Sequence, residues 1–251
     1  MVDPIAFNLG SISVSWYGIM FGLGLLFGFL LWKKLAKEED IDSVVILEYY
    51  LVGLIGVFVG CRLFHVFVYN PSYFLSNPVK IIAIWEGGLS SHGGMIGGPL
   101  AVYFYTKKKN LDFWKLLDLI TVPVVLSSAF IRIGNFLNGE LVGRITTMPW
   151  GVKFNNFEGL RHPVQLYESA KIFFIFGVLY FYRTLKFPKG AIFWGAIFLF
   201  SFLRFFTEFF KEYLVFSFGL TIGQWISLGL CVISGVILYL LFTKKLVLGK
   251  S

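Results

Sequence analysis

The feature that most constrains this chain is its series of long apolar runs. The cleanest one extends from Tyr213 to Thr243 without a charged residue, and a membrane-spanning helix needs about 20 mostly apolar residues. We therefore expect an all-α integral membrane protein with seven transmembrane helices, forming a single polytopic domain over residues 1–251. The expected spans are 12–32, 44–68, 89–106, 116–136, 166–183, 190–210 and 221–243.

Composition and charge placement support a membrane setting and argue against nucleic acid as a partner. Only 14% of the residues are charged, compared with about 25% in soluble domains. The net charge of +8 comes from Lys and Arg clusters that follow alternate spans, which is the positive-inside pattern rather than a basic patch. The clusters lie at 33–37, 107–109, 183–189 and 244–250.

This pattern predicts an orientation. The basic clusters face the cytoplasm together with the C-terminus, while the N-terminus and the loops at 69–88, 137–165 and 211–220 face outward. Because the N-terminal segment holds an acid and no basic residue, we expect the first run to remain as a spanning helix rather than a cleaved signal peptide.

The 137–165 segment is the largest expected extramembrane piece, a small extracytoplasmic head between spans four and five. Its sequence "MPWGVKFNN" predicts a short hairpin. Cys61 and Cys231 lie inside apolar runs, so we interpret them as small buried hydrophobic residues. No metal-ligand spacing is present, and we expect neither a metal nor a cofactor.

Glycines recur four residues apart, a spacing that lets helices approach closely in lipid. For the first three pairs we expect packing alone. The two later pairs follow His92, and glycine there permits close backbone approach or unusual dihedral angles. The pairs are Gly18/Gly22, Gly24/Gly28, Gly56/Gly60, Gly93/Gly97 and Gly94/Gly98.

Polar residues at the ends of the apolar runs gather at one expected depth, near the outer leaflet. A charge at the centre of a spanning helix costs about 2.5 to 3.5 kcal/mol on insertion scales, so such residues tend to be functional. A site that acts at the outer interface explains a common depth better than scattered ion pairs do. The set comprises Arg62, His65, His92, Arg132, Asn135, Asn138, Glu140, His162, Gln165, Glu168, Arg204 and Glu208.

Several of these residues have structural alternatives. Arg204 and Glu208 are spaced to share a helix face, so they are either a salt bridge or part of a site. Arg62 and His65 can snorkel toward lipid head groups, which is our preferred interpretation of His65.

Three further residues are open in the same way. His162, before Pro163, can cap a helix or form a hydrogen bond. Tyr17 fits an interfacial aromatic belt as well as a substrate contact. Asp118, the main exception to the common depth, can pair with Lys115 in a structural role.

The densest polar group is "RIGNFLNGELVG", residues 132–143. Arginine suits bidentate recognition of phosphate, and asparagine amides can hold glycerol hydroxyls or ester carbonyls. With Arg204 at the same expected depth, two arginines predict an anionic phosphodiester head group as the ligand.

This segment resembles the signature of bacterial prolipoprotein diacylglyceryl transferases, and the resemblance continues in order along almost the whole chain. The other similar segments are "SWYG" at 15–18, "CRLFHVFVYNP" at 61–71, "WEGGLSSHGGMIGG" at 85–98, "TMPWGVKF" at 147–154, "RHPVQLYE" at 161–168, "RFFTEFF" at 204–210 and "LTIGQWIS" at 220–227.

The resemblance implies an enzyme of the bacterial plasma membrane. It would move the diacylglyceryl group of phosphatidylglycerol to the lipobox cysteine of a preprolipoprotein signal peptide and release glycerol 1-phosphate. It implies catalytic roles for His92, Arg132, Glu140, Arg204 and Glu208. His92 can take the thiol proton as general base, or the nearby arginines alone can stabilise the thiolate. We expect substrate contacts from Tyr17, Arg62, Gly93, Gly94, Asn135, Asn138, Gly143 and His162.

Three positions depart from the family pattern. Ile131 and Met95 replace a usual Gly and Leu, which we interpret as packing changes. Lys211 stands where Arg is frequent, and since Lys cannot form a planar fork, a secondary phosphate contact there is in doubt.

Two other classes of membrane protein fit less well. A transporter would place polar residues at mid-membrane in broken, repeated helices. A phosphatidyl-transferring synthase would carry an acidic metal-binding motif. Neither pattern is present in the sequence.

Overall fold

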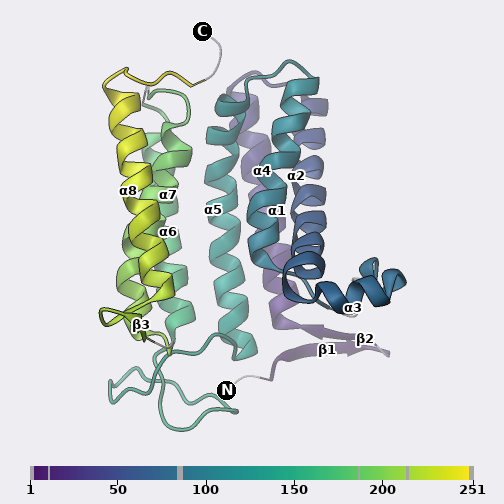
Figure 1. Ribbon diagram of the computed structural model, residues 1–251, viewed down its shortest axis with the longest axis vertical. Coiled ribbons are helices and arrows are strands. Elements are labelled where there is room, and N and C mark those ends of the chain that lie inside the picture. The colour runs from purple at the N-terminus through teal and green to yellow at the C-terminus, as the bar shows by residue number, and fades with distance from the viewer. Residues whose placement is uncertain (1–2, 11, 84–86, 186, 213–214, 249–251) are drawn as a thin grey trace. The chain divides into compact units, whose positions relative to one another are not determined.

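The computed structural model describes residues 3–10, 12–83, 87–185, 187–212 and 215–248 (Figure 1). Each predicted run corresponds to one long helix whose ends lie within a few residues of expectation. The long helices are α1 (Trp16–Glu38), α2 (Ser43–Phe64), α4 (Ser91–Lys108), α5 (Phe113–Asn138), α6 (Val164–Tyr182), α7 (Ala191–Thr207) and α8 (Ile222–Phe242).

Six segments in the described part of the chain are long and apolar enough to cross a membrane, which identifies a multi-pass membrane protein. They contain α1, α2, α5, α6, α7 and α8. Helix α4 is not among them: its 18 residues include four glycines and end in two lysines. Large apolar side chains stay exposed along the helices, as lipid contact requires. On α8 these include Ile222, Ile226, Val232, Ile233, Val236 and Tyr239.

Short elements were missed by the all-α prediction. Antiparallel strands β1 (Ile5–Leu9) and β2 (Ile12–Ser15) precede α1, and strands β3 (Val215–Ser217) and β4 (Leu220–Thr221) precede α8. The β3–β4 turn holds Phe218 at φ 50° and Gly219 at φ 74°, the backbone that two-residue hairpin turns require. The remaining short elements are η1 (His65–Tyr69), α3 (Pro71–Ser76), η2 (Pro78–Ile81) and η4 (Glu208–Phe210).

The chain forms two compact units. The first comprises residues 1–32 and 117–251, and the second residues 33–116. Within the first unit, α8 packs on α7, and α7 on α6. Helix α1 packs on α5 where the Ser127 hydroxyl donates to the Gly24 carbonyl at 2.7 Å. A Cβ on Gly24 would stand 2.8 Å from the Ser127 carbonyl oxygen, so this glycine pair serves packing as predicted.

Within the second unit, α2 and α4 meet through their glycines. A Cβ on Gly97 would stand 2.8 Å from the Gly60 Cα, and one on Gly94 would stand 2.8 Å from the Cys61 sulfur. The Gly93 position likewise faces the Gly60 carbonyl. Helix packing therefore gives a structural reason for the glycines that follow His92, while the predicted substrate contacts of Gly93 and Gly94 stay a prediction.

Packing does not account for every glycine pair, however. A Cβ on Gly22 would meet no atom within 4 Å, and one on Gly18 would only touch the Ser15 hydroxyl at 3.4 Å. The expectation that this first pair packs against another helix is therefore wrong.

The 139–163 segment is closed by backbone hydrogen bonds rather than by the predicted hairpin. No strand forms at 148–156, all of which the structure describes; instead Val152 and Arg161 exchange two hydrogen bonds of 2.9 Å in an isolated bridge. Phe154, 1% exposed, packs edge-on against Phe136 of α5. The segment thus has its own small core, anchored on the end of a spanning helix.

Asp118 has a structural role, but a different one from the predicted pairing. Its carboxylate accepts hydrogen bonds from the backbone N–H groups of Gly190 at 2.6 Å and Phe193 at 2.8 Å, at the start of α7, where a negative charge is favourable. The Lys115 ammonium lies 2.8 Å from Glu39 instead.

Candidate active site

Most of the predicted residues lie at one end of the helices of the first unit. The starts of α1, α6 and α8 and the ends of α5 and α7 lie at this end, as do the 139–163 segment and both hairpins (Figure 1). This arrangement agrees with the common depth expected from the sequence. The polar residues form two clusters, one at the end of α5 and one at the end of α7.

The first cluster is a chain of side chains at the end of α5. The Arg132 Nη1 lies 3.5 Å from the Asn135 Oδ1, and the Asn135 amide donates to the Glu140 carboxylate at 3.1 Å. The Asn138 amide donates to the other Glu140 oxygen. Asn135 is buried, Asn138 is half-buried and Glu140 is exposed, so two amides orient an accessible carboxylate beside a half-buried guanidinium.

Tyr17 lies next to this cluster at the start of α1. A Cβ on Gly134 would stand 3.2 Å from both the Cα and the ring of Tyr17, so the helices touch at this glycine. Glu140 and Arg132 both act electrostatically on the Tyr17 hydroxyl. Tyr17 therefore lies beside the α5 cluster, a location that a place in an aromatic belt does not by itself require.

Gly143 joins the head segment to the rest of the unit. Its N–H donates to the His162 carbonyl at 3.2 Å, and the next N–H, of Arg144, donates to the Phe210 carbonyl at 3.0 Å. A Cβ on Gly143 would stand 2.5 Å from Val164 and 2.7 Å from the Phe210 carbonyl. This glycine lets three backbone segments meet, which is a structural basis for its place in the motif.

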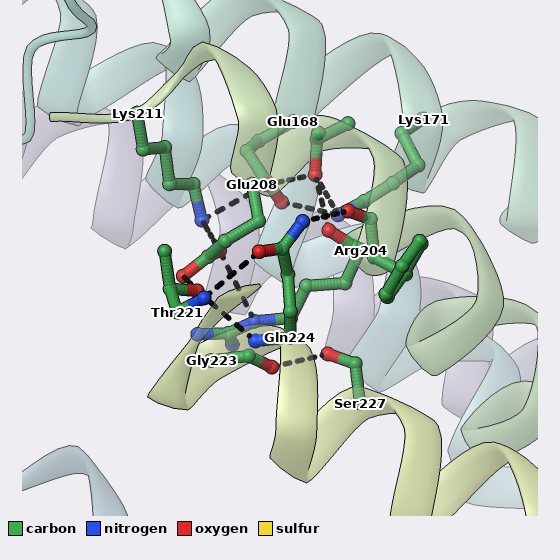
Figure 2. Close-up of polar contacts among 11 residues, drawn as sticks. Glu168, Lys171, Arg204, Glu208, Lys211, Thr221, Gly223, Gln224 and Ser227 are labelled. Carbon is green, nitrogen blue, oxygen red and sulfur yellow. Dashed lines mark hydrogen bonds and ion pairs between the residues drawn. The ribbon is translucent and has the colours of Figure 1, made fainter. Parts of the chain in front are cut away.

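The second cluster surrounds Glu208, which is 2% exposed (Figure 2). The Lys211 ammonium donates to the Glu208 Oε2 at 3.0 Å, while the Arg204 Nε is 3.8 Å from the same oxygen. Arg204 and Glu208 thus form a loose ion pair, and 38% of the Arg204 side chain is exposed. Within the described chain the Arg204 guanidinium makes no hydrogen bond.

The start of α8 closes over Glu208. Thr221 and Gln224 form a reciprocal capping box at this helix start, and the Thr221 hydroxyl lies 3.5 Å from the Glu208 Oε1. A Cβ on Gly223 would overlap the Glu208 carboxylate. Glycine is therefore required at position 223 of the "TIGQW" segment, where the start of α8 contacts the buried Glu208 carboxylate.

The second cluster extends to two charges on α6 that our predicted site omits. Glu168 accepts from Lys211 at 3.2 Å and from the Thr207 hydroxyl at 2.7 Å, and it pairs with Lys171 (Figure 2). Glu168 and Lys171 are 3% and 8% exposed. The sequence does carry a signal for this pair, namely two opposite charges three residues apart within an expected spanning helix. Charges are rare in such helices, and those that occur tend to be functional.

His162 forms a hydrogen bond rather than a helix cap. The Trp150 indole N–H donates to the Tyr167 hydroxyl at 2.7 Å, and that hydroxyl lies 3.1 Å from the His162 Nδ1. The Tyr167 hydroxyl thus links the indole of Trp150 to the imidazole of His162. Burial, and then the positive charge of Arg144, lower the pKa of His162.

Arg62, in the second unit, does not snorkel. Its guanidinium is 7% exposed, and its five N–H groups are matched by five carbonyl oxygens between residues 80 and 88. The acceptors are Ile81 at 2.8 Å, Gly87 at 2.6 Å, Gly88 at 3.0 Å, Lys80 at 2.5 Å and Ala83 at 3.2 Å. These contacts favour a role in ordering the loop before α4 over direct substrate contact.

His65, also in the second unit, starts the π-helical turn η1. Its ring packs against Tyr69 and Phe74, with centroids 5.9 and 5.8 Å apart. Gly88, at φ 78°, approaches so closely that a Cβ there would stand 2.6 Å from the His65 Nε2. Packing thus explains His65 better than the preferred snorkelling interpretation.

His92 occupies the first turn of α4, but its side chain lies outside the described part of the structure. Its predicted catalytic role stays a prediction.

The comparisons with known proteins agree with these motifs. The chain matches the prolipoprotein diacylglyceryl transferase family over residues 4–241. A relative from Tolumonas auensis is 39% identical over 97% of this chain and 96% of its own length. A relative from Chloroherpeton thalassium is 38% identical over 100% of this chain and 96% of its own length. A relative from Wolbachia pipientis is 37% identical over 95% of this chain and 94% of its own length. All three are named phosphatidylglycerol–prolipoprotein diacylglyceryl transferase.

Proposed function

Because the chain belongs to the prolipoprotein diacylglyceryl transferase family, we propose that it carries out the first step of lipoprotein maturation. It transfers the diacylglyceryl group of phosphatidylglycerol to the thiol of the lipobox cysteine in a preprolipoprotein signal peptide. The products are a thioether-linked lipid and glycerol 1-phosphate. The match covers both polar clusters and the helix that carries His92.

The observation that carries this proposal is the pair of arginines at one end of the first unit. Arg132 is half-buried beside the Asn135 amide, and Arg204 leaves 38% of its side chain exposed beside a carboxylate 3.8 Å away. Guanidinium groups with free donors suit phosphate recognition. They also offset negative charge that grows on a departing phosphate.

The reaction is a displacement at carbon. The thiolate sulfur attacks the glyceryl carbon that carries the phosphate ester, so a C–S bond forms while the C–O bond breaks. The electron pair leaves with the phosphate oxygen, as glycerol 1-phosphate. A thiol of pKa about 8.5 is mostly protonated at neutral pH, and His92 accepts its proton as general base.

The remaining residues bind and orient. Arg132 and Arg204 bind the phosphate, while Glu140, held by two asparagine amides, orients a glycerol hydroxyl. Glu208 sets the direction of Arg204, and Tyr17 contacts the lipid beside the first cluster. His162 contacts the head group.

The topology belongs to the same proposal. Seven helices, including α4, cross the bacterial plasma membrane as one domain of residues 1–251. The 137–165 segment is a head on the extracytoplasmic side with the N-terminus, and the C-terminus is cytoplasmic. The distribution of Lys and Arg supports this orientation.

Incubation of the purified protein with phosphatidylglycerol and a lipobox peptide tests the function. Mass spectrometry should detect a diacylglyceryl adduct on the peptide and equimolar glycerol 1-phosphate. A peptide with Ser in place of the cysteine is the control and should stay unmodified. Absence of the adduct, with phosphatidylglycerol bound to a folded protein, would disprove the assignment.

A further inference from the structure

The second cluster continues along α6 as a chain of alternating charges. Lys171 pairs with Glu168, Glu168 with Lys211 at 3.2 Å, Lys211 with Glu208 at 3.0 Å, and Glu208 with Arg204 at 3.8 Å (Figure 2). Three elements contribute, namely α6, α7 and the residues that follow α7. Three cations and two carboxylates leave one excess positive charge on the chain.

Exposure along the chain is uneven. The side chains of Lys171, Glu168 and Glu208 are 5%, 4% and 1% exposed, and that of Lys211 is 13% exposed. Arg204, at the end, is 38% exposed. Arg204 is therefore the member of this chain that is most accessible to an anionic ligand.

Lys211 decides how strongly Glu208 holds Arg204. A buried carboxylate needs a partner, because an unpaired buried charge costs several kcal/mol. Here the nearer partner of the Glu208 Oε2 is the Lys211 ammonium at 3.0 Å, not the Arg204 Nε at 3.8 Å. Glu168 on the other side keeps that ammonium in place.

We propose that Lys211 is a positioning residue that neutralises Glu208 and so leaves the Arg204 guanidinium available for the phosphate of the lipid substrate. Without the Lys211 charge, Glu208 draws Arg204 into a tight bidentate pair. The guanidinium is then held by the Glu208 carboxylate and no longer binds the phosphate of phosphatidylglycerol. This inference rests on the proposed function, because it assigns the phosphate to Arg204.

The test variant is Lys211→Met, which keeps the length of the side chain but removes the ammonium. With phosphatidylglycerol in mixed micelles and a lipobox peptide, we expect the KM for the lipid to rise about tenfold, and kcat to fall as well because Arg204 also offsets charge on the departing phosphate. Direct binding of phosphatidylglycerol, measured by native mass spectrometry, should weaken by a similar factor. Lys153→Met, at an exposed head residue, is the matched control and should leave both values unchanged.

A second variant separates positioning from general stability. Asp118→Asn changes the carboxylate that accepts from the backbone N–H groups at the start of α7 but leaves every contact of Lys211 and Glu208 in place. It disturbs the helix that carries Arg204 without altering the chain of charges, so the KM for phosphatidylglycerol should stay within about twofold of the original. An equal rise in KM in both variants would overturn the proposal.

Lys211→Arg supplies the third measurement and serves if the methionine variant does not fold. Arginine can also join two carboxylates, so it should retain the KM. A tenfold loss of lipid affinity in the Lys211→Arg variant would show that Lys211 does not act by neutralising Glu208. The activity of the unaltered protein distinguishes the two proposals. If the unaltered protein forms no adduct, the proposed function is wrong. If it is active and the Lys211→Met variant has the same KM for the lipid, only the inference about Lys211 is refuted.

Discussion

At the residue scale, Arg132 tests whether geometry or charge matters in the first cluster. Arg132→Lys keeps the positive charge but loses the planar fork that can bind two phosphate oxygens. It also loses the long contact with the Asn135 amide. We expect turnover to fall at least tenfold, equivalent to about 1.4 kcal/mol of transition-state stabilisation. Steady-state rates at saturating lipid check this, and equal rates would mean that charge alone suffices.

His92 carries the proposed proton transfer, and its test is a pH–rate profile. His92→Gln should still bind phosphatidylglycerol, because an amide occupies similar space, whereas transfer should fall by about 10² to 10⁴. The defect should shrink at alkaline pH, where hydroxide ionises more of a thiol of pKa about 8.5. Parallel profiles for the variant and the original protein would refute the general-base role.

His162 predicts a pH dependence of stability. Burial and Arg144 lower its pKa below the ordinary 6.5, so near and below that pH the unfolded chain binds more protons than the folded one. The stabilising contribution is therefore complete above 6.5 and declines as the pH falls toward the folded pKa. The midpoint of thermal unfolding should drop between pH 8 and pH 5. His162→Gln should flatten this drop; an equally steep drop would show that other groups cause it.

Arginine residues show what sequence can and cannot predict at this scale. Arg62, Arg132 and Arg204 all follow from the rarity of charges at the ends of spans. However, all five Arg62 N–H groups meet carbonyls 18 to 26 positions away in the chain. Only the fold shows whether an arginine's donors face the protein or remain available for a ligand.

At the element scale, the contact between α2 and α4 depends on glycine. Gly97→Ala would place a Cβ 2.8 Å from the Gly60 Cα, a backbone atom that cannot move alone. Overpacking of this kind costs about 1 to 3 kcal/mol. Gly177→Ala in α6 is the control, because nothing lies within 4 Å of its Cβ position, and alanine favours the helix.

Thermal unfolding in detergent measures both alanine variants. Only Gly97→Ala should lower the unfolding midpoint, and it should also reduce transfer if α4 holds His92 in place. Two variants of equal stability would show that the glycine contact between these helices is not needed.

Hydrophobic runs were sufficient to predict the helices but not the hairpins. A spanning helix leaves a signal of about 20 apolar residues, whereas β3 has 3 residues and β4 has 2. Their turn, Phe218-Gly219, is visible only as one glycine in an apolar sequence. The short strands depend on a turn and on neighbouring helices rather than on a pattern of their own.

At the scale of the whole molecule, motifs predicted the α5 cluster better than the α7 cluster. Arg132, Asn135, Asn138 and Glu140 are neighbours in sequence, so their contacts follow from one helix end. The second cluster joins α6 to the residues after α7, and the Glu168–Lys211 contact spans more than 40 positions. A single sequence shows that such charges exist but not which of them pair.

The orientation of the molecule is the remaining large-scale prediction. Basic clusters follow alternate expected spans, a pattern that predicts the cytoplasmic side for them and the opposite side for the head segment. In a variant without its own cysteines, a cysteine introduced at Asn156 should react with an impermeant thiol reagent added outside intact cells. One at Lys108 should react only after the membrane is opened.

Both side chains are exposed, so local burial does not confound the comparison. The reverse labelling pattern would place the α5 and α7 clusters on the cytoplasmic side, and an enzyme so oriented could not meet its peptide at the outer leaflet.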